Sequence, residues 1–155
     1  PAGGRAGTVL VWVRLVRSAR RRRPPRGPLA RGSGRPAPRL ASPRRVEKPW
    51  GHETIWAETP DYVGKILHVK AGHALSLQYH EEKDETIYLL SGEMTFQAGP
   101  SADELTDYDM KPGERYHVKT GTVHRMIAKT DVDILEASTN HLDDVVRLED
   151  RYGRG

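Results

Sequence analysis

Four side chains in the second half of the sequence are of types that hold metal ions: Gln78, His80, Glu85 and His124. Gln78 and His80 are two residues apart, so on a β-strand both point to the same face. Glu85 stands at the start of the next apolar run, and His124 follows a turn that contains Gly121. Imidazole, carboxylate and amide groups together suit a divalent first-row metal. Two histidine ligands leave coordination positions open, as a catalytic metal requires.

Short β-strands must bring these side chains together. Alternating or β-branched runs predict strands at 63–69, 75–79, 86–90, 93–97 and 131–137. Glycine- and proline-containing turns separate these runs. Strands interrupted this often by turns predict an all-β fold, a sandwich or a barrel. Residues 141–151 are the only segment whose pattern permits a helical turn or two.

The spacing of the four candidate ligands resembles the motifs of the cupin superfamily. The two matching stretches are Gly72-x5-Gln78-x-His80-x4-Glu85-x6-Gly92 and Gly113-x7-Gly121-x2-His124. Gln78 replaces the usual first histidine, and Lys119 and Ala128 replace the usual Pro and Asn of the second motif. The resemblance implies a single double-stranded β-helix, the cupin or jelly-roll barrel. It also implies one divalent metal ion, with Zn as the first choice and Mn, Fe, Co or Ni as alternatives.

Three further stretches narrow the resemblance: Lys48-Pro-Trp-Gly51, Leu75-Ser-Leu-Gln-Tyr-His80 and Asp144-Val-Val-Arg-Leu-Glu-Asp-Arg-Tyr-Gly-Arg154. They are similar to the cupin domain of mannose-6-phosphate isomerases, closest to the type II form, which can be fused to a mannose-1-phosphate guanylyltransferase. The likeness covers residues 46–154, and Gln in the metal motif is typical of that family. It implies a metal-dependent sugar-phosphate isomerase that interconverts mannose 6-phosphate and fructose 6-phosphate.

Aldose–ketose isomerisation needs a base that carries a proton and cations that stabilise the phosphate and enediolate charge. By the resemblance, the catalytic residues are Arg147, Lys83 and Asp143, with Asp143 as the base. Ser76, Lys83 and Arg147 are expected to bind the substrate. Both residues also have simpler interpretations. Arg147 would form an ion pair with Glu149 or Asp150, and Asp143 would cap the terminal turn.

One stretch departs from the type II pattern, in which consecutive histidines followed by Arg are common. Here the sequence is His80-Glu81-Glu82-Lys83, which adds two acids near the expected site of a phosphosugar. Two alternatives therefore stay open: a metal-binding cupin dioxygenase or other oxidoreductase acting on a small molecule, and a non-catalytic sugar-binding cupin. Redox-active Fe with O2 consumption favours the first, and metal retained without turnover favours the second.

Charge divides the 155 residues into two parts. Residues 1–45 hold 13 Arg and no acid, whereas 46–155 hold 12 basic and 21 acidic side chains, a net of −9. Pro, Gly and Arg dominate 1–45, and such a composition cannot bury enough surface to offset the entropy of ordering. We predict a disordered tail at 1–45 and a cupin domain at 46–155. The tail has three interpretations: a targeting peptide, a surface-binding tail or a non-native extension. No aromatic residues interleave the basic run, so we expect no nucleic-acid partner.

Composition also excludes several classes of protein. The chain has no cysteine, which excludes a disulfide scaffold, a thiolate metal site and a cysteine nucleophile. No run of 18 apolar residues is present, so we expect no membrane partner. The expected partner is a small molecule, a sugar phosphate. A homodimer through edge strands and a cytoplasmic location are expected, with an organellar address in the tail left open.

Overall fold

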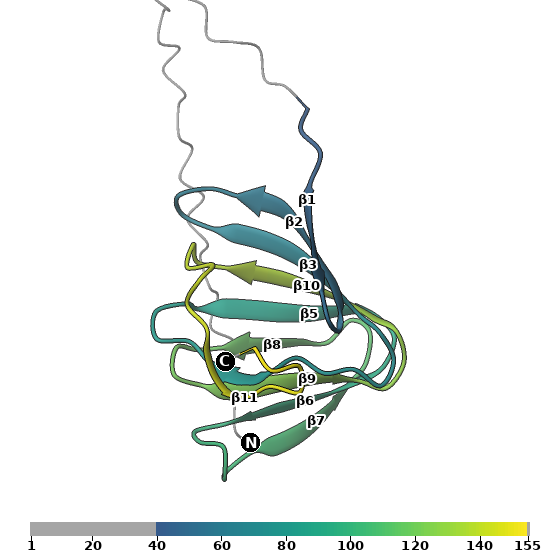
Figure 1. The fold of residues 1–155 in the computed structure, drawn as a ribbon, viewed down its shortest axis with the longest axis vertical. Helices are drawn as coiled ribbons and strands as arrows, with labels where there is room; N and C mark the ends of the chain where they lie inside the picture. Colours follow the sequence, from purple (N-terminus) through teal and green to yellow (C-terminus); the bar gives the residue numbers. More distant parts are fainter. Residues whose placement is uncertain (1–39, 155) are drawn as a thin grey trace, which may run out of the picture. The chain divides into compact units, whose positions relative to one another are not determined.

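The computed structural model describes residues 40–154, so residues 1–39 of the predicted tail lie outside the described residues. Within that part of the chain, every regular element is a strand (Figure 1). The strands are β1 (Arg44–Lys48), β2 (Gly51–Glu58), β3 (Val63–Val69), β4 (Leu77–Tyr79), β5 (Glu85–Ser91), β6 (Met94–Gly99), β7 (Thr106–Met110), β8 (Arg115–Val118), β9 (Val123–Ala128), β10 (Val132–Ser138) and β11 (Val146–Glu149). The prediction of an all-β fold is confirmed. The prediction of disorder up to residue 45 is wrong for Arg44 and Arg45, because they begin β1 and pair with Ile55 and Thr54. Among residues 40–154, no helix has the length and apolar character needed to cross a membrane.

The strands form two antiparallel sheets. The larger has the order β1-β2-β3-β10-β5-β8, and the smaller has the order β11-β4-β9-β6-β7. Neighbours in each sheet come from distant parts of the sequence, as where β10 lies between β3 and β5. This exchange of strands is the jelly-roll arrangement that the sequence predicted.

One hydrophobic core joins the two sheets. Leu67 and Ile87 enter it from the larger sheet, and Phe96 and Met126 enter it from the smaller one. The buried residues alternate along β6, as period-two patterning requires of a strand with one covered face. Burying each such side chain stabilises the fold by about 1.5–3 kcal/mol. The core therefore fixes which residues of each strand can face the interior.

The C-terminal segment differs from its prediction. Residues 141–151 contain a strand and no helical turn, because β11 pairs with β4 through Val146↔Tyr79 and Arg147↔Gln78. The β-branched residues of this segment favour an extended chain, and β4 offers an unpaired edge that only tertiary structure creates. The pairing brings Arg147 beside Gln78, which the sequence alone did not predict.

Candidate metal centre and its cavity

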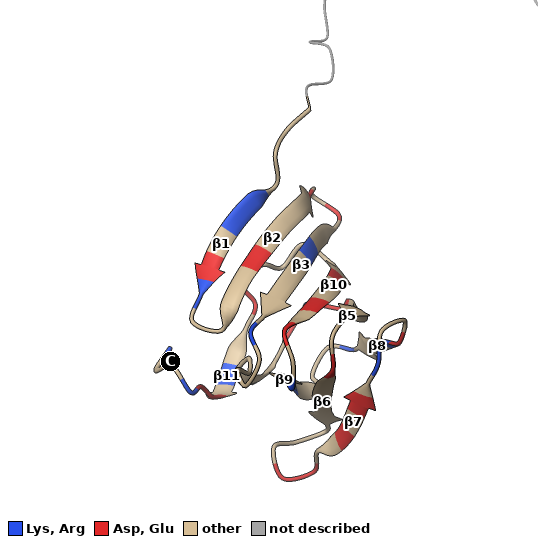
Figure 2. Cartoon of the chain, turned by 90° about the vertical axis from the view of Figure 1, so that its right-hand side faces the viewer, with Lys and Arg blue, Asp and Glu red and all other residues tan. Residues whose placement is uncertain are grey.

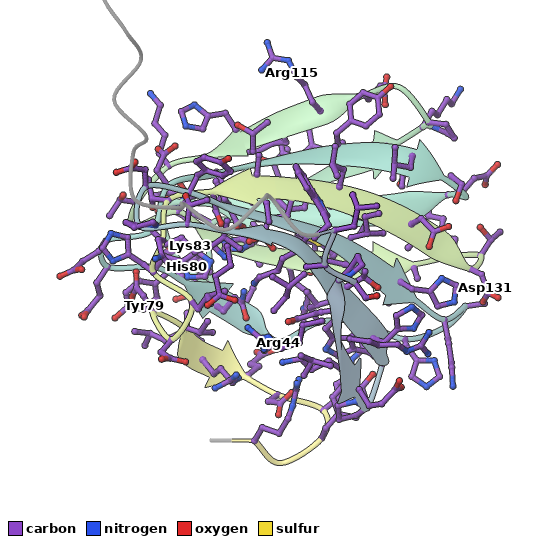
Figure 3. The ribbon with its side chains drawn as sticks, turned by 90° about the horizontal axis from the view of Figure 1, so that it is seen from above. Arg44, Tyr79, His80, Lys83, Arg115 and Asp131 are labelled. Carbon is purple, nitrogen blue, oxygen red and sulfur yellow. The ribbon has the colours of Figure 1, made fainter. Side chains whose placement is uncertain are left out.

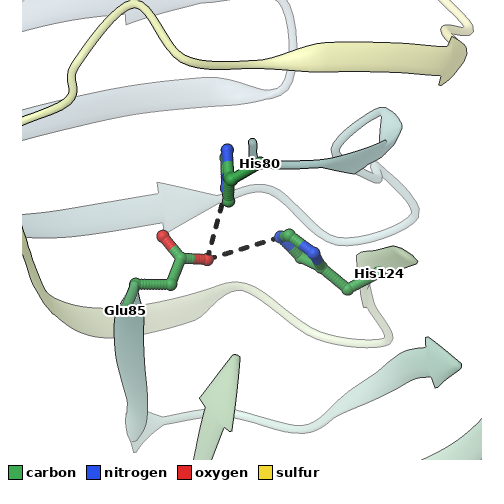
Figure 4. A group of neighbouring side chains, drawn as sticks. All are labelled: His80, Glu85 and His124. Carbon is green, nitrogen blue, oxygen red and sulfur yellow. Dashed lines mark ion pairs between the residues drawn. The ribbon is translucent and has the colours of Figure 1, made fainter. Parts of the chain in front are cut away.

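Three of the four predicted ligands converge at one end of the barrel. His80 directly follows β4, Glu85 begins β5 and His124 is the second residue of β9. Each is at most 2% exposed, and one potential ligand atom from each lies within 4.8 Å of the others. Glu85 Oε1 lies 3.3 Å from His124 Nε2 and 3.7 Å from His80 Nε2 (Figure 4). The two sheets thus contribute to a single His-Glu-His cluster.

The hydrogen bonds of His80 and His124 use Nδ1 of each ring and leave Nε2 free. His124 Nδ1 donates to the carbonyl of Thr122 at 2.9 Å, and His80 Nδ1 donates to the carbonyl of Asp144. The proton on Nδ1 leaves Nε2 as a lone pair directed at the carboxylate of Glu85. Within residues 40–154, neither Nε2 has a hydrogen-bond partner, although both are buried.

A cation fits this arrangement better than direct hydrogen bonds do. Charge-assisted N–H···O⁻ bonds are about 2.7–2.9 Å long, so the 3.3 and 3.7 Å contacts to Glu85 are too long for strong ones. Metal-binding histidines typically donate their outer nitrogen to a carbonyl, as His80 and His124 do here. The side chains of the cluster therefore suit a divalent metal.

The carboxyl group of Glu85 is held as an anion. Burial alone would raise the pKa of Glu85, but the ammonium of Lys83, 2.5 Å from Glu85 Oε2, holds that pKa below its usual range. An ionised carboxylate is the form that binds a metal ion.

The turn before β9 aligns the two histidines. Gly121 has a φ of 79°, a left-handed conformation that favours glycine. Its backbone N–H donates to the carbonyl of His80 at 2.8 Å. The same turn carries Thr122, whose carbonyl orients His124. One turn therefore holds the backbone of His80 and the ring of His124.

Gln78 lies next to the cluster. It is the register partner of His124 between β4 and β9, and it lines the same cavity as Glu85. Its amide oxygen accepts a hydrogen bond of 2.7 Å from the hydroxyl of Ser76. A role for Gln78 as the fourth ligand stays a prediction.

Asp144 fastens the segment that carries His80. Its carboxylate accepts the backbone N–H groups of Glu81, Glu82 and Lys83 at 3.0, 2.7 and 2.7 Å. Burial would raise the pKa of Asp144, but these bonds lower it to about 2. Sequence reasoning missed Asp144, because its partners are more than 60 residues away and no local pattern marks such a contact.

We expect Asp144→Asn to loosen this segment. The side-chain nitrogen of the introduced asparagine cannot accept hydrogen bonds from the two N–H groups that Asp144 Oδ2 accepts. This loss should lower the free energy of unfolding by about 1–3 kcal/mol. Metal affinity should fall about 10- to 100-fold, because the carbonyl of residue 144 also orients His80. In the wild type, the carboxylate's contribution should be complete above about pH 4 and lost as pH falls towards 2, because its folded-state pKa is the lower one.

Metal titration and thermal unfolding across this pH range measure both effects. Asp143→Asn is the matched control, since within residues 40–154 its side chain makes no hydrogen bond. Equal metal affinity and equal melting temperature in Asp144→Asn and the wild type would contradict the prediction.

A cavity of about 540 Å³ opens beside the cluster. Gln78 and Glu85 line it, whereas His80 and His124 do not. The predicted catalytic and substrate-binding side chains line it as well: Ser76, Lys83, Asp143 and Arg147. The structure therefore brings to one space the residues that the sequence placed on separate segments.

The cavity concentrates positive charge in an acidic domain. Its basic residues are Arg44, Lys48, Lys65, Lys83, Arg147 and Arg154, and its acids are Glu53, Glu85, Glu136 and Asp143. Two of the basic residues belong to β1, the strand at the edge of the larger sheet (Figure 2). Six cations against four acids make the cavity formally positive, although residues 40–154, with 14 basic and 21 acidic side chains, carry a net of −7. Such a local excess attracts anionic ligands.

A buried ion-pair network joins the cavity to the cluster. Lys83 Nζ lies 2.5 Å from Glu85 Oε2 and 3.0 Å from Glu136 Oε1, and Lys65 Nζ lies 3.5 Å from the same Glu136 oxygen. Burial would lower the pKa of Lys83, but Glu136 and Glu85 raise it above its ordinary value. Lys83 therefore remains an ammonium ion beside the cluster, close to His80 (Figure 3).

Arg147 is free of its acidic neighbours. Glu149 pairs with Arg125 at 3.1 Å and Asp150 pairs with Arg154 at 2.8 Å. Within residues 40–154, Arg147 forms no ion pair. The simpler interpretation of Arg147 as a surface ion-pair partner is therefore wrong, and its guanidinium is available to a ligand.

The family follows from the sequence and the fold together. Residues 65–137 match the sequence model of the Cupin domain family. With its jelly-roll topology and His-Glu-His cluster, the described domain belongs to the cupin superfamily.

Relatives within this superfamily are proteins of sugar metabolism. The chain is 31% identical to the mannose-1-phosphate guanylyltransferase ManC of Salmonella typhimurium over 72% of its own length and 23% of that protein. It is 29% identical to the xanthan biosynthesis protein XanB of Xanthomonas campestris pv. campestris over 72% of its length and 24% of that protein. The chain thus spans about a quarter of the length of the curated relatives it matches.

A solved structure supports the fold alone. The capsular polysaccharide assembling protein CapF from Staphylococcus aureus superposes with a TM-score of 0.63 at 18% identity, over 72% of this chain and 35% of that one.

Proposed function

We propose that this cupin domain is a metal-dependent sugar-phosphate isomerase that interconverts mannose 6-phosphate and fructose 6-phosphate. One observation carries the proposal: a single cavity contains a carboxylate of the candidate metal centre, two cations and an acid, namely Glu85, Lys83, Arg147 and Asp143. Salmonella ManC is named for a mannose phosphate, which is in keeping with a phosphosugar ligand.

Binding of the phosphate is assigned to the free cation of β11. Arg147 has no ion pair within residues 40–154 and lines the cavity, so its planar guanidinium can bind two phosphate oxygens at once. Ser76 lines the same cavity, and its hydroxyl donates to the phosphate when it gives up its hydrogen bond to the amide oxygen of Gln78. The formal positive charge of the cavity favours the dianion over a neutral sugar.

The chemical step needs a proton carrier and stabilised negative charge. His80, Glu85 and His124, with Gln78 as the fourth ligand, would hold a divalent metal, for which Zn suits the nitrogen and oxygen donors. When bound, the metal supplies Lewis-acid polarisation of the sugar's carbonyl and hydroxyl oxygens. Asp143 takes the proton from C2 of the aldose and returns it to C1, while the hydroxyl proton passes from O2 to O1. Lys83 stabilises the enediolate between these transfers.

Metal analysis beside a coupled assay tests the proposal. We expect about one equivalent of divalent metal per chain and turnover of mannose 6-phosphate that chelation abolishes, Zn restores and O2 does not affect. Asp143→Asn and Arg147→Ala should keep the metal, and Asp143→Asn should lose about 10²- to 10⁴-fold in turnover. Metal with sugar-phosphate binding but no turnover would assign a non-catalytic cupin, and O2 consumption would assign an oxidoreductase. Either result overturns the isomerase.

A further inference from the structure

A second pocket lies where the chain passes from the smaller sheet to the larger one. β7 is the edge strand of the smaller sheet, and the next strand, β8, is an edge strand of the larger sheet. The pocket is walled by the end of β6, the loop into β7, two tyrosines of β7 and β8, and the turn 119–122. We call it the seam pocket. Its volume of about 580 Å³ lies within the roughly 300–1,000 Å³ of small-molecule sites, and it shares no lining residue with the cavity beside Glu85.

The two tyrosines give the seam pocket a fixed aromatic wall. The rings of Tyr108 and Tyr116 have centroids 5.3 Å apart, and Tyr116 in turn packs against the buried ring of Phe96 at 4.8 Å. Tyr108 remains 39% exposed, so part of its ring is available to a ligand. A ring that its neighbours already hold loses little freedom when a ligand packs against it.

The polar side chains of the seam pocket have no partners within the protein. They are Glu104, Thr106, Lys119, Thr120 and Thr122. Among residues 40–154, none of these side chains forms a hydrogen bond or an ion pair. The side chains of β7 that point the other way are bonded: Asp107 to Gln97 and Asp109 to Thr95, both at 2.9 Å. The groups that line the pocket are therefore left for a ligand.

The charges of the seam pocket differ from those of the cavity beside Glu85. Lys119 and Glu104 are its two charged lining residues, so the seam pocket is formally neutral. The cavity beside Glu85 has six cations against four acids. An anionic ligand gains from the charge of that cavity, whereas an uncharged ligand suits the seam pocket.

We propose that the seam pocket binds a neutral saccharide, with the apolar face of a pyranose ring against Tyr108. The C–H groups on that face carry slight positive charge, and the face of an aromatic ring is negative. Sugar hydroxyls both donate and accept hydrogen bonds, which matches a carboxylate, an ammonium and three threonine hydroxyls. A purely apolar ligand would cover these polar groups without satisfying them. This site does not depend on the proposed isomerase.

Titration of the full chain with methyl α-D-mannopyranoside tests the proposal. This neutral glycoside is locked in its ring form, so an aldose–ketose isomerase cannot turn it over. We expect a dissociation constant of about 1 mM, as for other ligands of this size. In two-dimensional NMR spectra, the backbone signals of Tyr108 and Gly121 should shift, and those of Ser76 and Arg147 beside the metal centre should not. Glycerol has hydroxyls but no ring face, so it should not produce these shifts.

Variants of the seam pocket identify the contacts. Tyr108→Ala should raise the dissociation constant about 10-fold, and Tyr108→Phe, which keeps the ring, should stay within about 3-fold of the wild type. Glu104→Ala, in an exposed loop, should weaken binding about 10-fold through the loss of a charged acceptor. Tyr62→Ala is the control, since Tyr62 is 54% exposed and lies outside the pocket.

The outcomes separate this site from the proposed isomerase. Tyr108 and Glu104 do not line the cavity beside Glu85, so their variants should turn over mannose 6-phosphate as the wild type does. Arg147→Ala should bind the glycoside with wild-type affinity. The proposal is overturned if the glycoside causes no shifts at a 50-fold excess over the expected constant, or if glycerol causes the same shifts. It is equally overturned if Arg147→Ala abolishes binding, or if Tyr108→Ala and Glu104→Ala both leave it unchanged.

Discussion

Replacing His124 with alanine is expected to abolish tight metal binding. His124 Nε2 is a buried lone pair 3.3 Å from Glu85 Oε1, and its removal leaves the cluster with one imidazole. Metal affinity should fall by more than about 100-fold, because even residues that only orient a ligand cost 10- to 100-fold. Turnover of mannose 6-phosphate should be lost with it. Calorimetric titration with Zn²⁺ or Co²⁺ measures the affinity directly.

The thermal stability of the same variant gives an independent readout. Free metal at 100 times its dissociation constant stabilises the wild type by about 2.7 kcal/mol, so a chelator should lower its melting temperature. The variant should show no such shift. His117→Ala is the matched control. His117 is a histidine on β8 that lies outside the cluster, and its Nε2 lies 2.9 Å from Asp84 Oδ1. Wild-type metal affinity in the His124 variant would rule out the candidate metal centre.

The convergence of His80, Glu85 and His124 could be predicted in part because these residues lie at strand boundaries. Glu85 and His124 lie at the starts of strands, where the sequence placed them, and a turn with glycine marks the boundary before His124. The resemblance to cupin motifs supplied what periodicity cannot, namely that these strand ends meet. The sequence placed His80 on a strand with Gln78, but β4 ends at Tyr79, one residue before His80. The hydrogen bond from His80 to Asp144, not strand parity, orients its ring.

The buried network was missed because its charges look ordinary in the sequence. Lys65 and Glu136 are 6% and 3% exposed, yet each stands in a strand where alternating polar residues are common. A signal was present: Lys65 shares the parity of Leu67 and Val69, and Glu136 shares the parity of Ile134, all of which are buried. A charge at an inward position is costly unless paired. A charged residue at an inward position therefore predicts an oppositely charged partner across the barrel, but the sequence does not identify that partner.

Removing Lys83 is expected to cost both stability and turnover. Lys83→Met leaves Glu85 and Glu136 buried without the ammonium that lies 2.5 and 3.0 Å from them. Breaking a buried ion pair by deleting one partner destabilises a protein by about 3–5 kcal/mol. Denaturant unfolding of the metal-free protein measures this cost, and the coupled assay measures the loss of turnover.

A double variant separates the two roles of Lys83. Adding Glu136→Gln to Lys83→Met removes one of the two carboxylates that lost the ammonium but also leaves Lys65 without its partner, so the double-mutant cycle, rather than a return of stability, gives the coupling energy of the Lys83–Glu136 pair. Turnover should not return, because neither change restores a cation for the enediolate. Arg147→Met is the comparison: within residues 40–154 its side chain forms no ion pair, so it should lose substrate affinity with little change in stability. If Lys83→Met unfolds at the wild-type denaturant concentration, the network does not support the fold. If the double variant regains turnover, Lys83 acts only through structure.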